Sequence, residues 1–138
     1  MAKVQRIGVS LDPKLLDWFD KHIDERGYTN RSEAIRDLIR DKMVEEQWQA
    51  EDETCVAAVT LVYDHHGDAG HKLSHLQHNF HLTVISTMHV HIDHDNCLEV
   101  IILKGTAKGI QELGNKMISL RGVKHGKLVA TTTGSDLP

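Results

Sequence analysis

Residues 81–105, HLTVISTMHVHIDHDNCLEVIILKG, decide the fold, because they predict two strands joined by a tight turn. The strands are expected at His81 to Ile92 and at Cys97 to Leu103, and the D-H-D-N residues between them are typical of a turn. On a strand, side chains two positions apart point to the same face. His89 and His91 therefore present their imidazoles side by side.

The turn also returns Cys97 toward this histidine pair, so three metal-ligating side chains meet on one hairpin. Nitrogen and thiolate ligands favour zinc, copper or nickel over magnesium or calcium. Ordinary strand histidines beside a small buried cysteine are the alternative interpretation. However, nine of the 11 histidines of the chain lie between His65 and His94, which is unusually selective for polar surface positions. The sequence therefore predicts a transition-metal site.

The elements around the hairpin predict a ferredoxin-like domain. A strand at 55–63 and a helix at 69–79 precede the hairpin, and a helix at 107–120 and a strand at 122–131 follow it. This βαββαβ order is the split βαβ arrangement.

The N-terminal part predicts strand, helix, helix. Lys3 to Leu11 alternates apolar and polar residues, as a half-buried strand does. Asp12 and Pro13 are an N-cap and a first helical residue, and Asn30 and Glu33 have the spacing of a capping box for a second helix. A lone strand leaves backbone groups unpaired and two short helices bury little surface, so we expect this part to dimerise.

The stretches R-I-G-V-S-L-D from Arg6 and G-Y-T-N-R-S-E-A-I-R-D-L-I-R from Gly27 resemble the ribbon-helix-helix family of DNA-binding proteins. In that family a two-stranded ribbon enters the major groove. Residues 1–47 carry nine Lys or Arg and ten Asp or Glu, so the DNA prediction depends on the residue pattern and not on net charge. A solvated strand face is the alternative for the outward positions. The resemblance implies base contacts from Arg6, Gly8 and Ser10, and phosphate contacts from Asn30, Arg31 and Ser32.

With H-V-H-I-D-H-D-N-C-L-E and L-K-G in the second domain, nearly the whole chain resembles the nickel-responsive repressor NikR family. The resemblance implies an α+β protein with a ribbon-helix-helix domain at 1–47, a linker at 48–54 and a ferredoxin-like, ACT-type domain at 55–138. It also implies one square-planar Ni²⁺ per subunit. The implied nickel ligands are His89, His91 and Cys97 of one subunit and His78 of a neighbouring subunit.

The resemblance assigns supporting roles to three carboxylates. Glu99 is expected to orient a nickel ligand through a hydrogen bond, although a surface carboxylate would fit the sequence equally well. Glu33 and Asp37 lie one helical turn apart and could hold an additional monovalent or divalent cation, or simply cap and pair within the helix.

Two features outside the implied site are also informative. His65, His66 and His94 could bind further metal weakly, but we expect them to be exposed polar residues. The sequence Gly67-Asp68 stands where relatives often have basic residues that touch the DNA backbone, so an acidic residue here would repel phosphate.

The expected function is a nickel-dependent repressor of nickel-uptake genes, acting as a tetramer built from two dimers on a palindromic operator in double-stranded DNA. A metal-dependent enzyme or a metal buffer are the alternatives, but no general base stands out and both would leave the ribbon unexplained. No apolar run reaches membrane-spanning length and the N-terminus lacks a signal-peptide core, so no membrane partner and a cytoplasmic location are expected.

Overall fold

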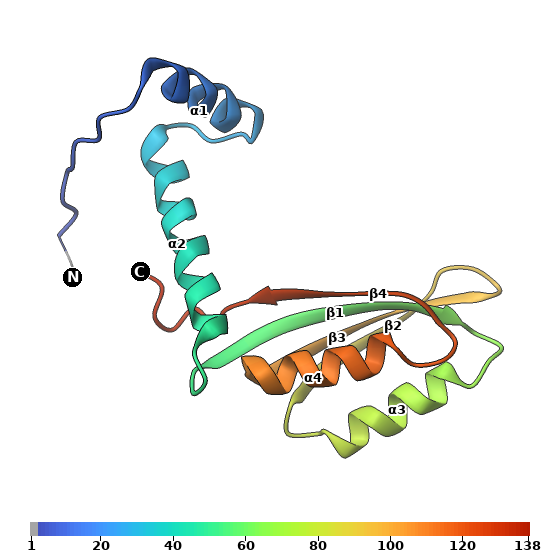
Figure 1. The fold of residues 1–138 in the computed structure, drawn as a ribbon. Coiled ribbons are helices and arrows are strands. Elements are labelled where there is room, and N and C mark those ends of the chain that lie inside the picture. The colour runs from blue at the N-terminus through green and yellow to red at the C-terminus, as the bar shows by residue number, and fades with distance from the viewer. Residues whose placement is uncertain (1–2) are drawn as a thin grey trace. The chain divides into compact units, whose positions relative to one another are not determined.

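A computed structural model describes residues 3–138 and shows eight regular elements (Figure 1). In chain order these are α1 (Pro13–Glu25), α2 (Arg31–Gln49), β1 (Thr54–Asp64), α3 (Ala69–Asn79), β2 (Val84–His91), β3 (Asn96–Thr106), α4 (Ala107–Ile118) and β4 (Val123–Thr131). The predicted α+β class, with two N-terminal helices before a βαββαβ domain, is confirmed. The chain forms two compact units, Met1–Asp41 and Lys42–Pro138, which are described separately.

In the N-terminal unit, the helix boundaries follow the predicted signals. The Asp12 carboxylate accepts a hydrogen bond from the Lys14 amide at 2.8 Å, and Pro13 opens α1. The side-chain oxygen of Asn30 accepts one from the Glu33 amide at 2.9 Å, which caps α2. Only half of the expected capping box forms, because the Glu33 carboxylate accepts a hydrogen bond from the Thr29 hydroxyl instead.

Residues 3–11 form no strand in the described chain, although the sequence predicts one. Within the N-terminal unit they meet no neighbouring strand that could accept and donate the ladder hydrogen bonds. Their apolar side chains are open to solvent, with Ile7, Val9 and Leu11 exposed by 78%, 61% and 45%. The ribbon therefore stays a prediction for a pair of chains.

Helix α2 continues through Gln49, into the segment that the sequence assigns to the linker. The side chain of Trp48 explains the extension. It packs against the core of the C-terminal unit, and its indole N–H donates to the Thr131 carbonyl at 2.8 Å. This anchorage holds the last turn of the helix, where the polar sequence alone suggested a break.

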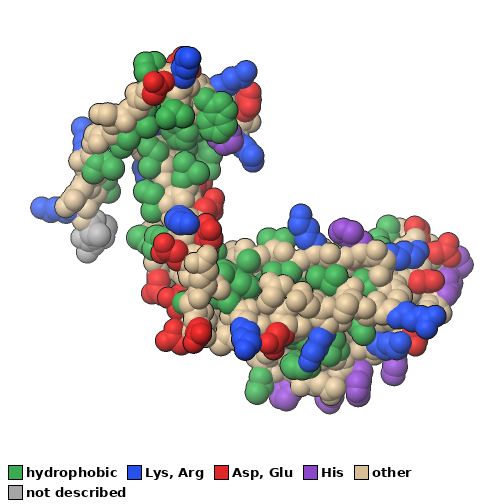
Figure 2. All heavy atoms as spheres, in the orientation of Figure 1, with side chains coloured by type: hydrophobic (Ala, Val, Ile, Leu, Met, Phe, Trp, Pro, Cys, Tyr) green, Lys and Arg blue, Asp and Glu red, His purple; other side chains and the backbone are tan. Residues whose placement is uncertain are grey.

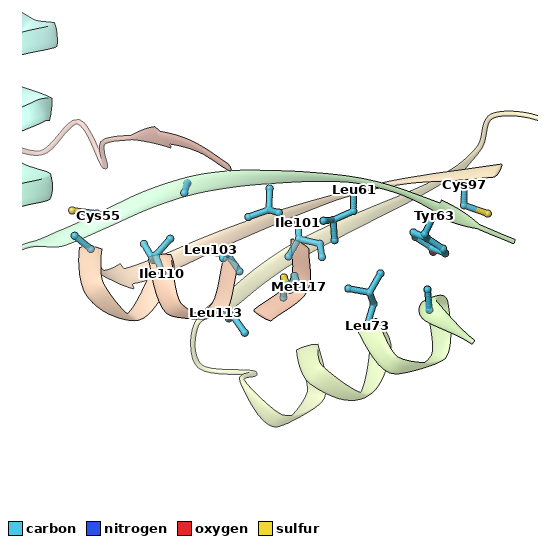
Figure 3. Packing of buried hydrophobic residues seen from close by; sticks show 14 residues of the cluster. Cys55, Leu61, Tyr63, Leu73, Cys97, Ile101, Leu103, Ile110, Leu113 and Met117 are labelled. Atoms are coloured by element: carbon cyan, nitrogen blue, oxygen red, sulfur yellow. The ribbon is translucent and has the colours of Figure 1, made fainter. Parts of the chain in front are cut away.

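The C-terminal unit is a four-stranded antiparallel sheet in the order β2-β3-β1-β4, with α3 and α4 on one face (Figure 1). Alternate residues of β1 and β3 point to these helices and are buried. Figure 3 shows apolar side chains of strands and helices interdigitating between the two layers. Each fully buried Leu or Ile contributes roughly 1.5–3 kcal/mol to the stability of the unit. The largest buried apolar side chains are Leu61, Leu73, Ile101, Leu103, Ile110, Leu113 and Met117.

An irregularity in β2 decides which of its residues face the helices. Val84 lies opposite Leu103, whereas Ser86 lies opposite Ile102, so Ile85 is an extra residue in the ladder. A bulge of this kind shifts the alternation of side chains by one position. After it, His89 and His91 lie opposite Glu99 and Cys97 on the helix-covered face.

The opposite face of the sheet, which we call the open face, carries apolar residues without a covering layer of helices in the described chain. Met88, Val90 and Val129 are exposed there by 61%, 39% and 52%. Among residues 3–138, no helix is both long and apolar enough to cross a membrane.

Candidate metal centre

The thiol of Cys97 lies at one end of the sheet, beside two imidazoles. Its Sγ atom is 3.6 Å from Nδ1 of His91 and 3.3 Å from Nδ1 of His65. One ligand atom of each of these residues lies within 4.8 Å of the other two. Figure 3 shows Cys97 close to Tyr63, at the end of the sheet opposite Cys55. A soft sulfur and borderline nitrogens therefore converge at this end.

His65 joins this group although the sequence favoured an exposed polar residue there over a weak metal ligand. It is exposed, but its backbone N–H donates to the Asp95 carbonyl at 2.8 Å, which holds it against the β2–β3 turn. The antiparallel register explains its position: Tyr63 pairs with Cys97, so the chain leaving β1 passes the thiol. That register was the signal that could have identified His65.

His89 lies on the same face as His91, but its ring is held by a separate hydrogen-bond network. Its Nδ1 is 2.9 Å from the Tyr63 hydroxyl and 3.3 Å from Oε1 of Glu99. The Tyr63 hydroxyl donates to the same Glu99 oxygen at 3.0 Å. Because that hydroxyl already donates its proton to Glu99, it can only accept a hydrogen bond from His89. This places the imidazole proton on Nδ1. The Nε2 lone pair of His89 is then available for a metal.

The carboxylate of Glu99 is buried, with only 6% of the residue exposed. Besides Tyr63 and His89 it accepts a hydrogen bond from the Gln77 side chain at 2.6 Å. A buried carboxylate requires such partners, and here they link α3, β1 and β2 around one acidic group. Glu99 also raises the pKa of the Tyr63 phenol, after the larger effect of burial, so that the hydroxyl keeps its proton.

Burial raises the pKa of the Cys97 thiol, and the negative charges of Glu99, Asp64 and Asp93 raise it further. A divalent cation reverses this preference, because it stabilises the thiolate directly. The donor set at this site, one thiolate with neighbouring imidazoles, fits nickel by ligand softness. The residues present are therefore suited to the metal that the sequence implies.

His78 does not belong to the Cys97 group within this chain. It is exposed in the last turn of α3. Its neighbour Gln77 reaches Glu99, whereas His78 is not one of the two described residues, His65 and His91, that group with the thiol. A contribution from a second copy of the chain is not tested by a single chain and stays a prediction. Figure 2 shows several histidine side chains at the surface of the C-terminal unit.

The residues expected to contact DNA are at the surface of the N-terminal unit. Arg6, Gly8 and Ser10 are exposed on the segment before α1, and Ser32 is exposed in the first turn of α2. The Arg31 guanidinium forms a bidentate ion pair with the Asp20 carboxylate, with both N–O distances at 2.8 Å. This exposed pair is the feature that sequence reasoning missed.

Glu33 and Asp37, the acidic residues expected to hold a further cation, already have hydrogen-bond or ion-pair partners within the chain. The Asp37 carboxylate accepts a hydrogen bond from the Tyr28 hydroxyl at 2.6 Å and pairs with Arg40 at 3.2 Å. The Tyr28 hydrogen bond, more than Arg40, lowers the pKa of Asp37. Glu33 accepts from Thr29, so a cation would have to compete with these partners.

In the loop after β1, the acidic residue of the Gly67-Asp68 pair is partly neutralised. The Lys72 ammonium lies 3.3 Å from the Asp68 carboxylate, one helical turn along α3. Lys72 therefore offsets a charge that would otherwise repel phosphate, although both side chains are exposed and the pair is weak.

Two family models match the chain, one for each part. Residues 5–46 match the ribbon-helix-helix protein of the copG family, and residues 56–131 match the NikR C terminal nickel binding domain. Both matched ranges lie inside the domains that the sequence predicts, whose boundaries at 47 and 55 stay a prediction.

Similar proteins cover almost the full length of the chain. A protein of Geobacter sulfurreducens is 54% identical and one of Solibacter usitatus 51% identical, each over 99% of both chains. A protein of Pyrococcus furiosus is 52% identical over 97% of this chain and 98% of its own. All three are described as nickel-responsive regulators. An uncharacterized protein of Thermotoga maritima, 21% identical, covers 58% of this chain and 100% of its own with a TM-score of 0.52, which supports the fold alone.

Proposed function

The chain belongs to the NikR family of nickel-responsive transcriptional regulators, and from that membership we propose that it represses transcription, most simply of nickel-uptake genes, when nickel binds to its C-terminal unit. As a member of this family it is a DNA-binding regulator and not an enzyme. The observation that supports the proposal best is the convergence of a buried thiol and imidazoles at one end of the sheet.

The proposed nickel ligands remain His89, His91 and Cys97 of one chain with His78 of a neighbouring copy. His89 is favoured because Tyr63 and Glu99 hold its Nδ1 and leave Nε2 free. His65 is exposed and lies 3.3 Å from the thiol, so it is the competing imidazole. A His89→Gln variant should therefore lose more nickel affinity than a His65→Gln variant.

Bound nickel would supply a positive charge that compensates the thiolate, and a ligand from a second copy would join two C-terminal units. The open face is apolar and exposed, so it offers a further surface for pairing C-terminal units. Residues 3–11 expose apolar side chains that a second N-terminal unit would cover. Both surfaces support a tetramer built from two dimers. Each subunit of this tetramer would bind one nickel ion.

Such a tetramer would carry two ribbons and could contact both halves of a palindromic operator in double-stranded DNA. Nickel would favour DNA binding only if it binds more tightly to the arrangement of the tetramer that contacts DNA than to the other arrangements. A ligand set shared between copies provides that difference, because it is complete in one arrangement and broken in another.

Operator binding with and without nickel tests the proposal. Fluorescence anisotropy with DNA from the promoter region of the gene itself should show tight binding with Ni²⁺ and weak binding after chelation. A Cys97→Ala variant should not respond to nickel. Equal binding by the wild-type protein with and without nickel would contradict the proposed function.

A further inference from the structure

A second group of potential metal ligands lies beside the Cys97 site and shares none of its residues. One ligand atom of each of His66, His94 and Asp95 lies within 4.8 Å of the other two. We propose that these three residues bind a second divalent transition-metal ion in each chain, separately from the ion expected at Cys97.

The ligand set defines the class of ion. Two imidazoles and one carboxylate suit nickel, zinc or copper, whereas magnesium and calcium prefer oxygen ligands alone. His66 and Asp95 are exposed, with 52% and 68% of their side chains open to solvent. Water can therefore complete the coordination, and this site binds more weakly than one that contains a thiolate.

The ligands come from two loops whose backbones are already fixed to each other. His66 follows β1, and Asp95 lies in the turn between β2 and β3. The backbone N–H of His65 donates to the Asp95 carbonyl at 2.8 Å across the two loops. The N–H of His66 donates to the Asp64 carboxylate at 2.9 Å, which fixes the start of the first loop.

The second loop is held by Asp93. Its carboxylate accepts hydrogen bonds from the backbone N–H groups of Asp95 at 2.9 Å and of Asn96 at 2.8 Å. These bonds form a compact turn that presents His94 and Asp95 toward the first loop. Little backbone order has to be created when an ion binds, which lowers the entropic cost of binding.

The three side chains already face one another. Nε2 of His66 lies 3.1 Å from Oδ1 of Asp95, and the His66 and His94 ring centroids are 5.1 Å apart. An exposed histidine–carboxylate pair contributes little to stability, so an ion can replace that contact at small cost.

The charges around the turn also favour a cation. Asp64 and Asp93 add negative charge beside Asp95. The Lys124 ammonium donates to the side-chain oxygen of Asn96 at 2.6 Å, and its one positive charge offsets only part of the charge of the three carboxylates. The local field therefore attracts a divalent ion in addition to its three ligands.

The two sites are neighbours but remain chemically distinct. The His65 and His66 rings are 5.4 Å apart, yet His65 belongs to the thiol group and His66 to the carboxylate group. Filling one site consumes no ligand of the other. The second site does not depend on the proposed repressor function, because it would exist whatever DNA the protein binds.

The test counts nickel per chain in the full-length protein. Equilibrium dialysis against Ni²⁺, followed by metal analysis, is compared for the wild-type protein and for a His66→Gln/His94→Gln variant. A His71→Gln/His125→Gln variant is the matched control, since it also removes two exposed imidazoles of the same unit. Thiolate-to-nickel absorption reports on the Cys97 site in every sample.

We expect the wild-type protein and the control to bind one more equivalent, at higher free nickel, than the His66→Gln/His94→Gln variant, with the thiolate absorption unchanged in all three. An Asp95→Asn variant should weaken the extra equivalent at least tenfold. Equal nickel counts in all proteins would overturn the second site, and so would an equal loss in the control. Absence of thiolate absorption in the wild-type protein would contradict the Cys97 site, whereas its loss in the His66→Gln/His94→Gln variant alone would overturn the separateness of the second site.

The position of the extra ion is checked by NMR of ¹⁵N-labelled histidines, with Zn²⁺ added to nickel-loaded protein. The ring signals of His66 and His94 should shift, and that of His125 should not. Shifts confined to other histidines would overturn the assignment.

Discussion

The Tyr63 hydroxyl lies 2.9 Å from Nδ1 of His89 and is hydrogen-bonded at the same time to the buried carboxylate of Glu99. One phenol thereby fixes both the tautomer and the orientation of an imidazole that is 26 residues away in the chain. A positioned imidazole binds metal more tightly, because less freedom is lost on binding.

A Tyr63→Phe substitution tests this relationship. The phenylalanine ring keeps the packing of a residue that is only 2% exposed, but the His89 N–H loses the nearer of its two acceptors and keeps only the longer contact with Glu99. We expect nickel affinity to fall roughly 10- to 100-fold, as for other residues that support metal ligands. Competition with a chelator measures the change, and an unchanged affinity would show that the phenol does not act through His89.

The role of the thiolate is tested by a pair of cysteine substitutions. Cys97→Ala should abolish thiolate-to-nickel absorption and most high-affinity binding. Cys55→Ala is the matched control, since Cys55 is also buried and free but its thiol contacts the Gln47 carbonyl at the other end of β1. If Cys97→Ala kept the absorption, the nickel site would have to lie elsewhere.

Subunit exchange tests whether His78 acts across an interface. Neither a His78→Ala protein nor a Cys97→Ala protein should form complete sites alone. Mixed tetramers should recover a fraction of them, because one chain supplies His78 and the other supplies the remaining ligands. With exchange verified by mass spectrometry, absence of any recovery would indicate a site within one chain.

Nickel affinity should depend on pH through the Cys97 thiol. Burial raises the pKa of this thiol, so the free protein carries the proton at neutral pH and releases it when nickel binds. Loss of one proton makes the affinity rise by about tenfold per pH unit below that pKa. Chelator competition between roughly pH 7.5 and 8.5 should show this rise, and a flat profile would mean that no thiol proton is released.

The two arginines of the N-terminal unit should differ in effect. Arg6→Ala should cost roughly 1–3 kcal/mol on the operator and little on random DNA, as expected for a base contact. Arg31→Ala should weaken both and reduce the salt dependence, as expected for a phosphate contact. Since the Arg31–Asp20 pair is exposed, its loss should barely change stability. Unchanged operator affinity in Arg6→Ala would contradict the ribbon assignment.

Hydrophobic periodicity was sufficient to predict the C-terminal elements. Helix α3 spans the predicted residues Ala69–Asn79, and every strand of the sheet overlaps its predicted range. Local patterns carry this information because the buried faces of helices and strands repeat at fixed intervals.

Properties that depend on distant segments were not predictable in the same way. The place of His65 follows from the pairing of Tyr63 with Cys97, which no local pattern encodes. The last turn of α2 depends on the contact of Trp48 with Thr131. A strand at residues 3–11 requires a second chain, and the pairing of Arg31 with Asp20 requires the turn between two helices.

The extra residue Ile85 changes the face of the sheet to which the following side chains of β2 point. Had Ile85 been absorbed into a regular ladder, Ser86, Met88 and Val90 would face the helices, and His89 would point to the open face, away from Cys97. The bulge therefore allows Val84 to pack against the helices while His89 and His91 face the same side, and deleting Ile85 should leave His89 opposite Glu99, because His91 would still pair with Cys97.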